Sequence, residues 1–259
     1  PSGVGKTETA LAIADQFFGG EEALTTINMT EFKEAHKASM LLGASAGYVG
    51  YGKGGVLTEA IRQKPYSVLL LDEMEKAHPA IHDIFFQIFD KGQISDSEGN
   101  RIDFRNTIII MTSNAGGESL KEFVHITSKE RKTQDWIAHI RSELLDFFSP
   151  AFLGRTELIF YRPLTNVVSE KIVHLYLDRI KIRVQEQHNA RLEWSPTFVK
   201  HVIQSNNDPL SGGRAFEKII NNGFLPKLAE ECINRVISGE VLRNIYVGFN
   251  GAEMTLDIS

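Results

Sequence analysis

The first seven residues combine glycines, a lysine and a threonine in a pattern that suits phosphate chemistry. Pro1-Ser2-Gly3-Val4-Gly5-Lys6-Thr7 matches the phosphate-binding loop G-x-x-x-x-G-K-[ST] without its first glycine. In such a loop backbone N–H groups surround the phosphates, the lysine reaches the β and γ oxygens, and the threonine hydroxyl ligates Mg²⁺. We therefore predict that ATP and Mg²⁺ bind here, and we expect the missing glycine and the strand that feeds the loop upstream of Pro1.

A helix should follow this loop, because Ala10, Ile13, Ala14 and Phe17 recur at helical spacing before Gly19-Gly20. A helix N-terminus is a favourable place for an anion. A glycine-rich turn that merely resembles the motif is the alternative, and the helix argues against it. The predicted nucleotide-binding residues are Ser2, Gly3, Val4, Gly5, Lys6, Thr7 and Glu8.

Two carboxylates follow a short apolar run farther along the chain. Val68–Leu71 is β-prone and leads into Asp72 and Glu73. Buried carboxylates need partners, and a Mg²⁺–phosphate site supplies one. We predict that Asp72 and Thr7 hold Mg²⁺, and that Glu73 is the general base that accepts a proton from the attacking water. Solvated acids at a strand end are the alternative, which the loop at Lys6 disfavours.

A third β-prone run, Thr107–Met111, leads into Thr112-Ser113-Asn114. The Asn114 amide could orient the attacking water near the γ-phosphate. Asparagine after a strand is more often a turn residue. The position of Asn114 after the acidic strand favours the catalytic interpretation.

The elements that must position these side chains alternate along the first part of the chain. Nearly all-apolar runs occur at 24–29, 68–71, 107–112 and 157–161, with helical patterns between them. Uninterrupted apolar strands separated by helices predict an α/β fold whose parallel sheet is covered on both faces.

The pattern changes after Pro163. Amphipathic helices are predicted at about 165–187, 196–205, 211–221 and 225–238, before a hairpin across 244–258. We therefore predict a P-loop α/β large domain at residues 1–163 and a smaller, mainly helical α+β lid domain at residues 164–259.

Charge and composition exclude several classes of partner. The 28 basic and 33 acidic side chains give a net charge of -5, so no electrostatic argument favours nucleic acid or an anionic membrane. The longest apolar runs are far too short for a membrane span. The single Cys232 is interpreted as a small core residue and fits a reducing compartment. We expect a cytoplasmic protein.

The combined motifs resemble the second ATPase module of the Clp family of AAA+ proteins, across essentially the whole chain. The runs that carry this resemblance are 47–52 (GYVGYG), 62–67 (RQKPYS), 71–79 (LDEMEKAHP) and 103–107 (DFRNT). Two further runs, 85–92 (FFQIFDKG) and 152–155 (FLGR), are most similar to the ClpV branch of type VI secretion. In ClpB disaggregases we expect leucines in the first of these and asparagine in place of Gly154.

The resemblance implies a homo-hexameric ring with one ATP at each subunit boundary. Arg155 matches the arginine finger, which completes the neighbouring subunit's site by stabilising charge on the transferring phosphoryl group. Arg214, in Gly212-Gly213-Arg214, matches sensor 2, which contacts the γ-phosphate in its own subunit. The family more often has Gly-Ala-Arg there, and the extra glycine is expected to loosen the start of the helix.

Tyr48, followed by Val49, matches the pore-loop aromatic that grips a polypeptide in the central channel. The flanking glycines make the loop mobile, and an aromatic ring gives a grip that tolerates many sequences. A tyrosine packed beneath a glycine turn is the alternative for the residues alone. The resemblance to ClpV implies a contracted secretion sheath as the protein substrate. A ClpB-like disaggregase, or a nucleotide-gated scaffold that threads nothing, are the alternatives.

Two other patterns receive no function. His78 and His82, near Glu75, have a spacing that could bind a metal, but the segment matches a Clp segment that is not a zinc site, so we interpret both as helix-surface histidines. The run 115–132 lacks the aliphatic-Gly-hydrophobic tripeptide of a peptidase-docking loop. Val247-Gly248-Phe249 has the right letters but falls in the predicted lid hairpin, so no peptidase partner is expected.

Overall fold

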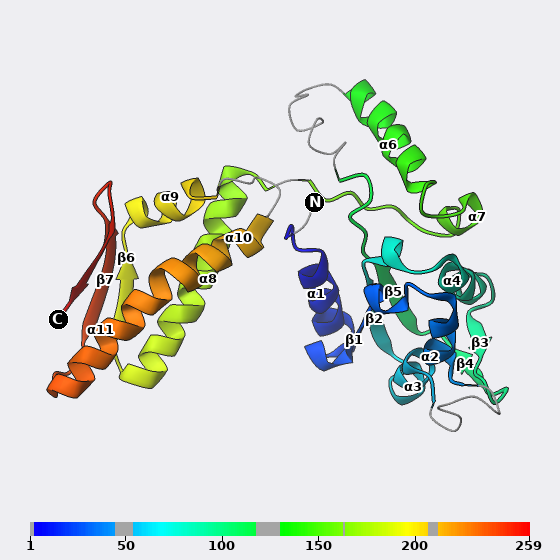
Figure 1. Ribbon diagram of the computed structural model, residues 1–259, viewed down its shortest axis with the longest axis horizontal. Coiled ribbons are helices and arrows are strands. Elements are labelled where there is room, and N and C mark those ends of the chain that lie inside the picture. The colour runs from blue at the N-terminus through cyan, green and yellow to red at the C-terminus, as the bar shows by residue number, and fades with distance from the viewer. Residues whose placement is uncertain (1–2, 45–53, 118–129, 163, 207–211) are drawn as a thin grey trace. The chain divides into compact units, whose positions relative to one another are not determined.

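The computed structural model describes residues 3–44, 54–117, 130–162, 164–206 and 212–259. The chain divides into two compact units (Figure 1). The larger unit is Gly5–Tyr161, and the smaller unit is Arg162–Ser259 together with Pro1–Val4. Each unit is described by itself.

A three-stranded parallel sheet forms the centre of the larger unit. Its strands are β1 (Leu24–Asn28), β2 (Ser67–Asp72) and β5 (Thr107–Met111), in the order β1-β2-β5. The four residues 68–71 of the middle strand are all 0% exposed. A strand buried on both faces must be apolar at every position, and this confirms the α/β parallel-sheet prediction.

Helices cover both faces of this sheet (Figure 1). On one face α1 (Lys6–Phe18) packs Ala10 and Ala14 with Val68 and Leu70. Leu69 and Leu71 point the other way, because side chains alternate along a strand. The elements on their side are α2 (Ala38–Leu42), α3 (Val56–Gln63), α4 (Pro79–Lys91), α6 (Glu130–Leu144), α7 (Pro150–Leu153), and the hairpin of β3 (Gln93–Ser95) and β4 (Arg101–Asp103).

The predicted strand at residues 157–161 is wrong. The backbone there is extended without a strand ladder to any strand that the structure describes. Leu158 and Phe160 are partly buried against the core instead. Apolar alternation reports burial, and a strand also requires a hydrogen-bonding neighbour at the edge of a sheet.

The smaller unit packs helices on a separate three-stranded sheet. Its helices are α8 (Asn166–His188), α9 (Pro196–Gln204), α10 (Gly212–Ile219) and α11 (Leu225–Ser238). A five-residue π-helical segment, Ile220–Phe224, joins the last two. Strand β7 (Asn244–Phe249) pairs with β6 (Arg191–Trp194) in parallel and with β8 (Met254–Ile258) in antiparallel orientation. The helical α+β prediction is confirmed, whereas β6 was not predicted.

Local sequence explains where the helices of this unit begin. The Thr165 hydroxyl accepts a hydrogen bond from the N–H of Val168 at 3.4 Å, and the Ser195 hydroxyl accepts one from Phe198 at 3.1 Å. Such side chains satisfy N–H groups that lack partners in the first turn of a helix. Cys232 is buried in the core of this unit, as predicted, and burial raises the pKa of its thiol.

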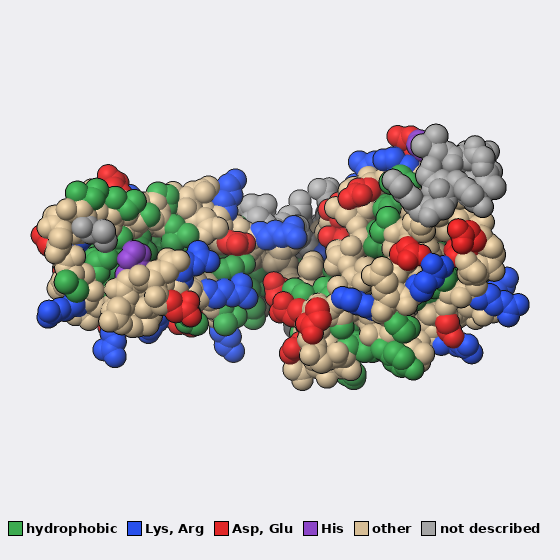
Figure 2. Space-filling view, turned by 90° about the horizontal axis from the view of Figure 1, so that it is seen from below, with side chains coloured by type: hydrophobic (Ala, Val, Ile, Leu, Met, Phe, Trp, Pro, Cys, Tyr) green, Lys and Arg blue, Asp and Glu red, His purple; other side chains and the backbone are tan. Residues whose placement is uncertain are grey.

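Acidic and basic side chains are interspersed on both units in the face that Figure 2 shows. This agrees with the near balance of charges in the sequence. Within the described ranges, no helix combines the length and the apolar character that a membrane crossing requires.

Candidate nucleotide site

The phosphate loop ends at an open helix N-terminus. Gly5 precedes α1 with φ of 95°, a left-handed conformation that glycine adopts without strain, and no side chain among the described residues caps the helix there. The N–H groups of the first turn, from Lys6 to Glu8, are therefore suited to an anion. Ser2 lies outside the described residues.

The Lys6 side chain contacts Asn114, the residue predicted to orient the attacking water, 108 positions later in the sequence. Its ammonium donates to the Asn114 side-chain oxygen at 2.7 Å and to the Ser113 carbonyl at 2.9 Å. The carboxyl ends of parallel strands share one edge of a sheet, where α/β folds bind their ligands. The structure thus brings the phosphate loop and the end of β5 together, while the role of Asn114 in orienting water stays a prediction.

Thr112 holds the acidic pair at the end of β2. Its hydroxyl donates to Asp72 Oδ1 and accepts from the N–H of Glu73 at 3.1 Å. Thr112 is buried. Sequence reasoning assigned this threonine no role. The strand register was the missing signal, since Leu71 lies opposite Met111 and the next residues along are Asp72 and Thr112.

Glu73 has an unusual backbone conformation. Its φ of 59° and ψ of 50° place it in the left-handed region, which costs a residue with a Cβ about 1–2 kcal/mol. The hydrogen bond to Thr112 and a second one, from Lys76 N–H to the Glu73 carbonyl at 2.9 Å, hold it there. Residues in such conformations cluster at functional sites, and this one is the predicted general base.

Glu75 is a second residue that the sequence did not single out for this site. Its Oε1 accepts from the backbone N–H of Asn114 at 3.2 Å. Its Oε2 is buried and has no hydrogen-bond partner among the described residues. The carboxylate thus anchors the backbone that presents the Asn114 amide.

The residues at this edge fit ATP with Mg²⁺. The Thr7 hydroxyl and the Asp72 carboxylate are hard oxygen ligands, the type that Mg²⁺ prefers. The Lys6 ammonium and the open N-terminus of α1 are suited to the phosphates. The individual roles of these residues stay predictions.

Arg155 lies at the surface, just after α7. Its Nη2 and Nε atoms are 2.7 and 3.0 Å from Asp90 Oδ1, and its guanidinium carbon is 4.3 Å from the centroid of the Phe86 ring. Both partners belong to α4 of the same chain. The structure therefore shows what holds the side chain, while its role as an arginine finger stays a prediction.

The predicted sensor 2 lies in the smaller unit. Arg214 is exposed on α10, and the preceding Gly213 donates its N–H to the Gly3 carbonyl at 2.7 Å. A methyl group on residue 213 would make an ordinary contact of 3.4 Å with that carbonyl. Tyr48 and Val49 lie outside the described residues.

The interpretation of His82 as a surface histidine is wrong. Its ring is 5.1 Å from Phe148 and 5.5 Å from Phe152, and Nε2 is 3.1 Å from the Met74 carbonyl. Burial lowers the pKa of this imidazole. His82 follows Ile81 on the face of α4 that enters the core, and an apolar stripe wide enough for both includes it. His78 is half-buried, and its Nδ1 accepts from Ala80 N–H at 3.2 Å as the N-cap of α4.

Comparisons with known proteins agree with this geometry. Residues 1–159 match the family model of the AAA domain (Cdc48 subfamily), and residues 164–244 match that of the C-terminal, D2-small domain of ClpB protein. A closed-state reconstruction of Hsp104 with ATPγS and FITC casein has a TM-score of 0.83 and 32% identity, over 99% of this chain and 43% of that chain.

Curated relatives give the same result. The AAA+ ATPase ClpV1 of Pseudomonas aeruginosa is 45% identical over 258 residues, which is 100% of this chain and 29% of the relative. The chaperone protein ClpB of Yersinia enterocolitica is 48% identical over 230 residues, which is 89% of this chain and 26% of the relative. The chain thus spans less than a third of either relative. It belongs to the Clp family of AAA+ ATPases and corresponds to the second ATPase module of that family.

Proposed function

We propose that this chain is the ATP-hydrolysing module of a ring motor that remodels proteins. The observation that carries the proposal is the cluster at the carboxyl edge of the sheet. Lys6 contacts Asn114 there, and Thr112 joins Asp72 to the backbone of Glu73. A phosphate-binding lysine, a metal-binding acid, a general base and an amide that orients water are the parts that phosphoryl transfer to water requires.

Each residue of this cluster is assigned one role in ATP hydrolysis, according to its chemistry. Lys6 binds the β and γ oxygens of ATP, and Thr7 and Asp72 hold Mg²⁺, which neutralises phosphate charge when bound. Glu73 accepts a proton from the attacking water, and Asn114 orients that water. Thr112 keeps Asp72 and the Glu73 backbone in place through its two hydrogen bonds.

The site is completed by a neighbour in the proposed homo-hexamer. Arg155 of one subunit stabilises the γ-phosphoryl charge in the next, and Arg214 contacts the γ-phosphate within its own subunit. The exposure of both side chains supports these roles. Tyr48 and Val49 grip the protein substrate in the central channel.

For the substrate we propose the contracted sheath of type VI secretion, in the cytoplasm. Two observations support this choice: the similarity to ClpV1 extends over the entire chain, and the run 85–92 carries three phenylalanines. Phe85 and Phe89 are 6.4 Å apart between ring centroids, and Phe86 underlies Arg155. A general disaggregase is the second candidate, since the ClpB relative is 48% identical.

The hydrolytic role is tested with Glu73→Gln in the full-length protein. We expect turnover to fall about 10²- to 10⁴-fold, with ATP affinity unchanged, because the carboxylate activates water and does not hold the nucleotide. Turnover is measured by phosphate release and affinity by nucleotide titration. A parallel loss of affinity would mean that Glu73 has a structural role.

The motor is distinguished from a scaffold with Tyr48→Ala and its control Tyr48→Phe. Sheath disassembly and refolding of an aggregated reporter are measured beside ATP turnover. We expect the alanine variant to hydrolyse ATP and lose its work on protein, and the phenylalanine variant to keep most of it, because the grip is apolar. The task that wild type performs identifies the substrate class. Normal work by Tyr48→Ala on both tasks would rule out this loop as the grip.

A further inference from the structure

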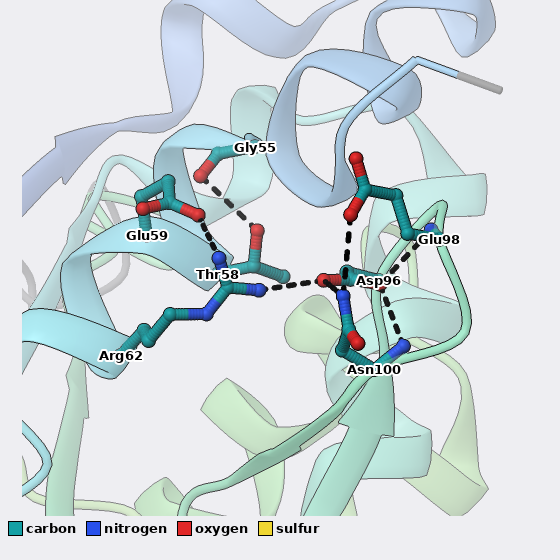
Figure 3. A network of polar contacts seen from close by, with 7 residues as sticks. All are labelled: Gly55, Thr58, Glu59, Arg62, Asp96, Glu98 and Asn100. Atoms are coloured by element: carbon teal, nitrogen blue, oxygen red, sulfur yellow. Dashed lines mark hydrogen bonds and ion pairs between the residues drawn. The ribbon is translucent and has the colours of Figure 1, made fainter. Parts of the chain in front are cut away.

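A polar network organises the turn between β3 and β4 (Figure 3). Asp96 begins this turn, and its Oδ1 accepts from the N–H of Glu98 at 2.9 Å and of Asn100 at 2.8 Å. Its Oδ2 accepts from the Asn100 side-chain amide at 3.0 Å. One carboxylate therefore fixes the backbone of the entire turn, which is a strong form of the Asx-turn.

The same carboxylate is bound by an arginine from α3. Arg62 Nη2 is 2.6 Å from Asp96 Oδ2, and Arg62 Nη1 also pairs with Glu59 (Figure 3). The Asp96 side chain is only 7% exposed. Burial acts to raise the pKa of this carboxyl, but the hydrogen bonds from Asn100 and Glu98 and the charge of Arg62 outweigh it and lower the pKa. A charged hydrogen bond with one shielded partner is stronger than an ordinary surface ion pair.

The turn also contacts the backbone that leads into α3. Ser97 N–H donates to the Leu42 carbonyl at 3.1 Å, and Gly43 forms an antiparallel bridge with Gly54. A Cβ on Gly55 would lie 2.0 Å from the Leu41 carbonyl oxygen, so glycine alone permits this close approach. We call residues 41–43 and 54–55 the stem. They flank the segment 45–53, which lies outside the described residues.

The turn and α3 are connected through opposite ends of β2. Helix α3 leads into the start of β2, and the end of β2 leads through α4 into β3. The ion pair between Arg62 and Asp96 links α3 directly to the turn, in addition to their connection along the chain. A hairpin with three residues in each strand is not stable by itself. Its position therefore depends on the packing of Ile94 and Ile102 against the core, on the Ser97–Leu42 hydrogen bond and on this ion pair.

We propose that Arg62 and Asp96 form a brace that makes the turn 96–100, the stem and α3 move as one body with β2, and so couples ATP hydrolysis to work on the protein substrate. The inference rests on the proposed function, because coupling has meaning only in a motor. Both are positioning residues. If the pair contributed only to stability, its loss would change the unfolding midpoint and leave the work done per ATP unchanged.

The test is a double-mutant cycle in the full-length protein, with Arg62→Gln, Asp96→Asn and the combination. Asp96→Asn keeps a side-chain oxygen for the turn and removes the charge. Glu59→Gln is the matched control, because it removes the other partner of Arg62. The readouts are basal ATP turnover, protein processed per ATP hydrolysed on the substrate that wild type processes, and hydrogen exchange of the amides in residues 96–100.

We expect both single variants to keep basal turnover within about twofold and to lose about threefold to tenfold in protein processed per ATP. The combined variant should lose no more than either single one, since the two remove one interaction. Amide exchange in the turn should rise in Arg62→Gln. It should stay at the wild-type rate in Glu59→Gln. Arg62→Lys should recover part of the coupling, because it keeps the charge but not the planar fork.

Two results would overturn the brace. One is wild-type work per ATP in both single variants, and the other is additive losses in the combined variant. Glu73→Gln in the same assay separates this failure from a failure of the proposed function. If wild type hydrolyses ATP and processes protein while Glu73→Gln does neither, the motor stands whatever the brace variants do.

Discussion

At the carboxyl edge of the sheet, Lys6 is hydrogen-bonded to Asn114, and Asp72 is hydrogen-bonded to Thr112, two residues before Asn114, all within one chain. At the end of α7, Arg155 is held by Asp90 and Phe86 of its own α4. The first region is assembled by the fold of a single subunit. The second presents an exposed group whose proposed phosphate partner belongs to another subunit. The difference teaches that groups acting in cis can be verified in one chain, whereas a group acting in trans must be tested by mixing chains.

The largest effect that tests this comparison is expected from Arg155→Ala. Turnover in assembled rings should fall about 10³-fold or more, the usual contribution of an arginine finger. When these subunits are mixed with Lys6→Ala subunits, some interfaces regain both groups, so activity should exceed the average of the two parents. ATP turnover across a series of mixing ratios checks this. Activity that never exceeds the parental average would place Arg155 in cis.

Thr112→Val tests the cis region. The variant keeps the shape of the side chain but loses the hydroxyl that bonds Asp72 and the N–H of Glu73. A hydrogen bond to a charged group contributes about 1.5–3 kcal/mol, so turnover should fall roughly 10- to 100-fold. Thr112→Ser is the control and should retain most activity. If the valine variant turns over like wild type, the Thr112 bonds do not position the acidic pair.

Asp90→Asn tests whether the ion pair with Asp90 restrains Arg155, the group proposed to act on the neighbouring subunit. The ion pair with Arg155 is exposed, so its loss should change kcat/KM by no more than about fivefold. We expect an increase, because a guanidinium released from Asp90 is freer to meet phosphate. Asp83→Asn, on the same helix, removes the same charge without touching Arg155 and should leave kcat/KM unchanged. A decrease specific to Asp90→Asn would instead assign Asp90 the role of positioning the finger.

The smallest effect is expected at His82, which contacts the Met74 carbonyl next to the acidic pair and the Phe152 ring of α7. Burial lowers the pKa of its imidazole, so below about 6.5 the unfolded chain binds a proton that the folded chain does not. The free energy of unfolding should therefore decrease as the pH falls through this range. His82→Gln retains a donor for the Met74 carbonyl and should cost about 1 kcal/mol or less at pH 7.5.

This prediction is checked by urea unfolding of wild type and of His82→Gln between pH 7.5 and 5.5. The glutamine variant should lose stability less steeply over this interval, because it has no imidazole to titrate. Equal slopes for the two proteins would show that other groups account for the acid sensitivity.

The sequence by itself determined the fold class and most of the elements around the site. A short apolar run such as 68–71, one of several separated by helical patterns, predicts a strand buried on both faces, and α1 followed from its spacing and its flanking glycines. The sequence also predicted the Asn114 amide near the phosphates from its position after a strand, and in the structure the side-chain oxygen of Asn114 accepts a hydrogen bond from Lys6. These inferences succeed because they depend on periodicity and on chain connectivity.

Only the tertiary structure decided the rest, because it depends on register and on contacts between segments far apart in sequence. Thr112 joins the site through the register of β2 with β5, and Glu75 through its hydrogen bond to the Asn114 N–H. The segment 157–161 has the apolar pattern of a strand but lacks a neighbouring strand in the described sheet. His82 lies on the core-facing side of α4, and its burial depends on Phe148 and Phe152, which are more than sixty positions away in the sequence.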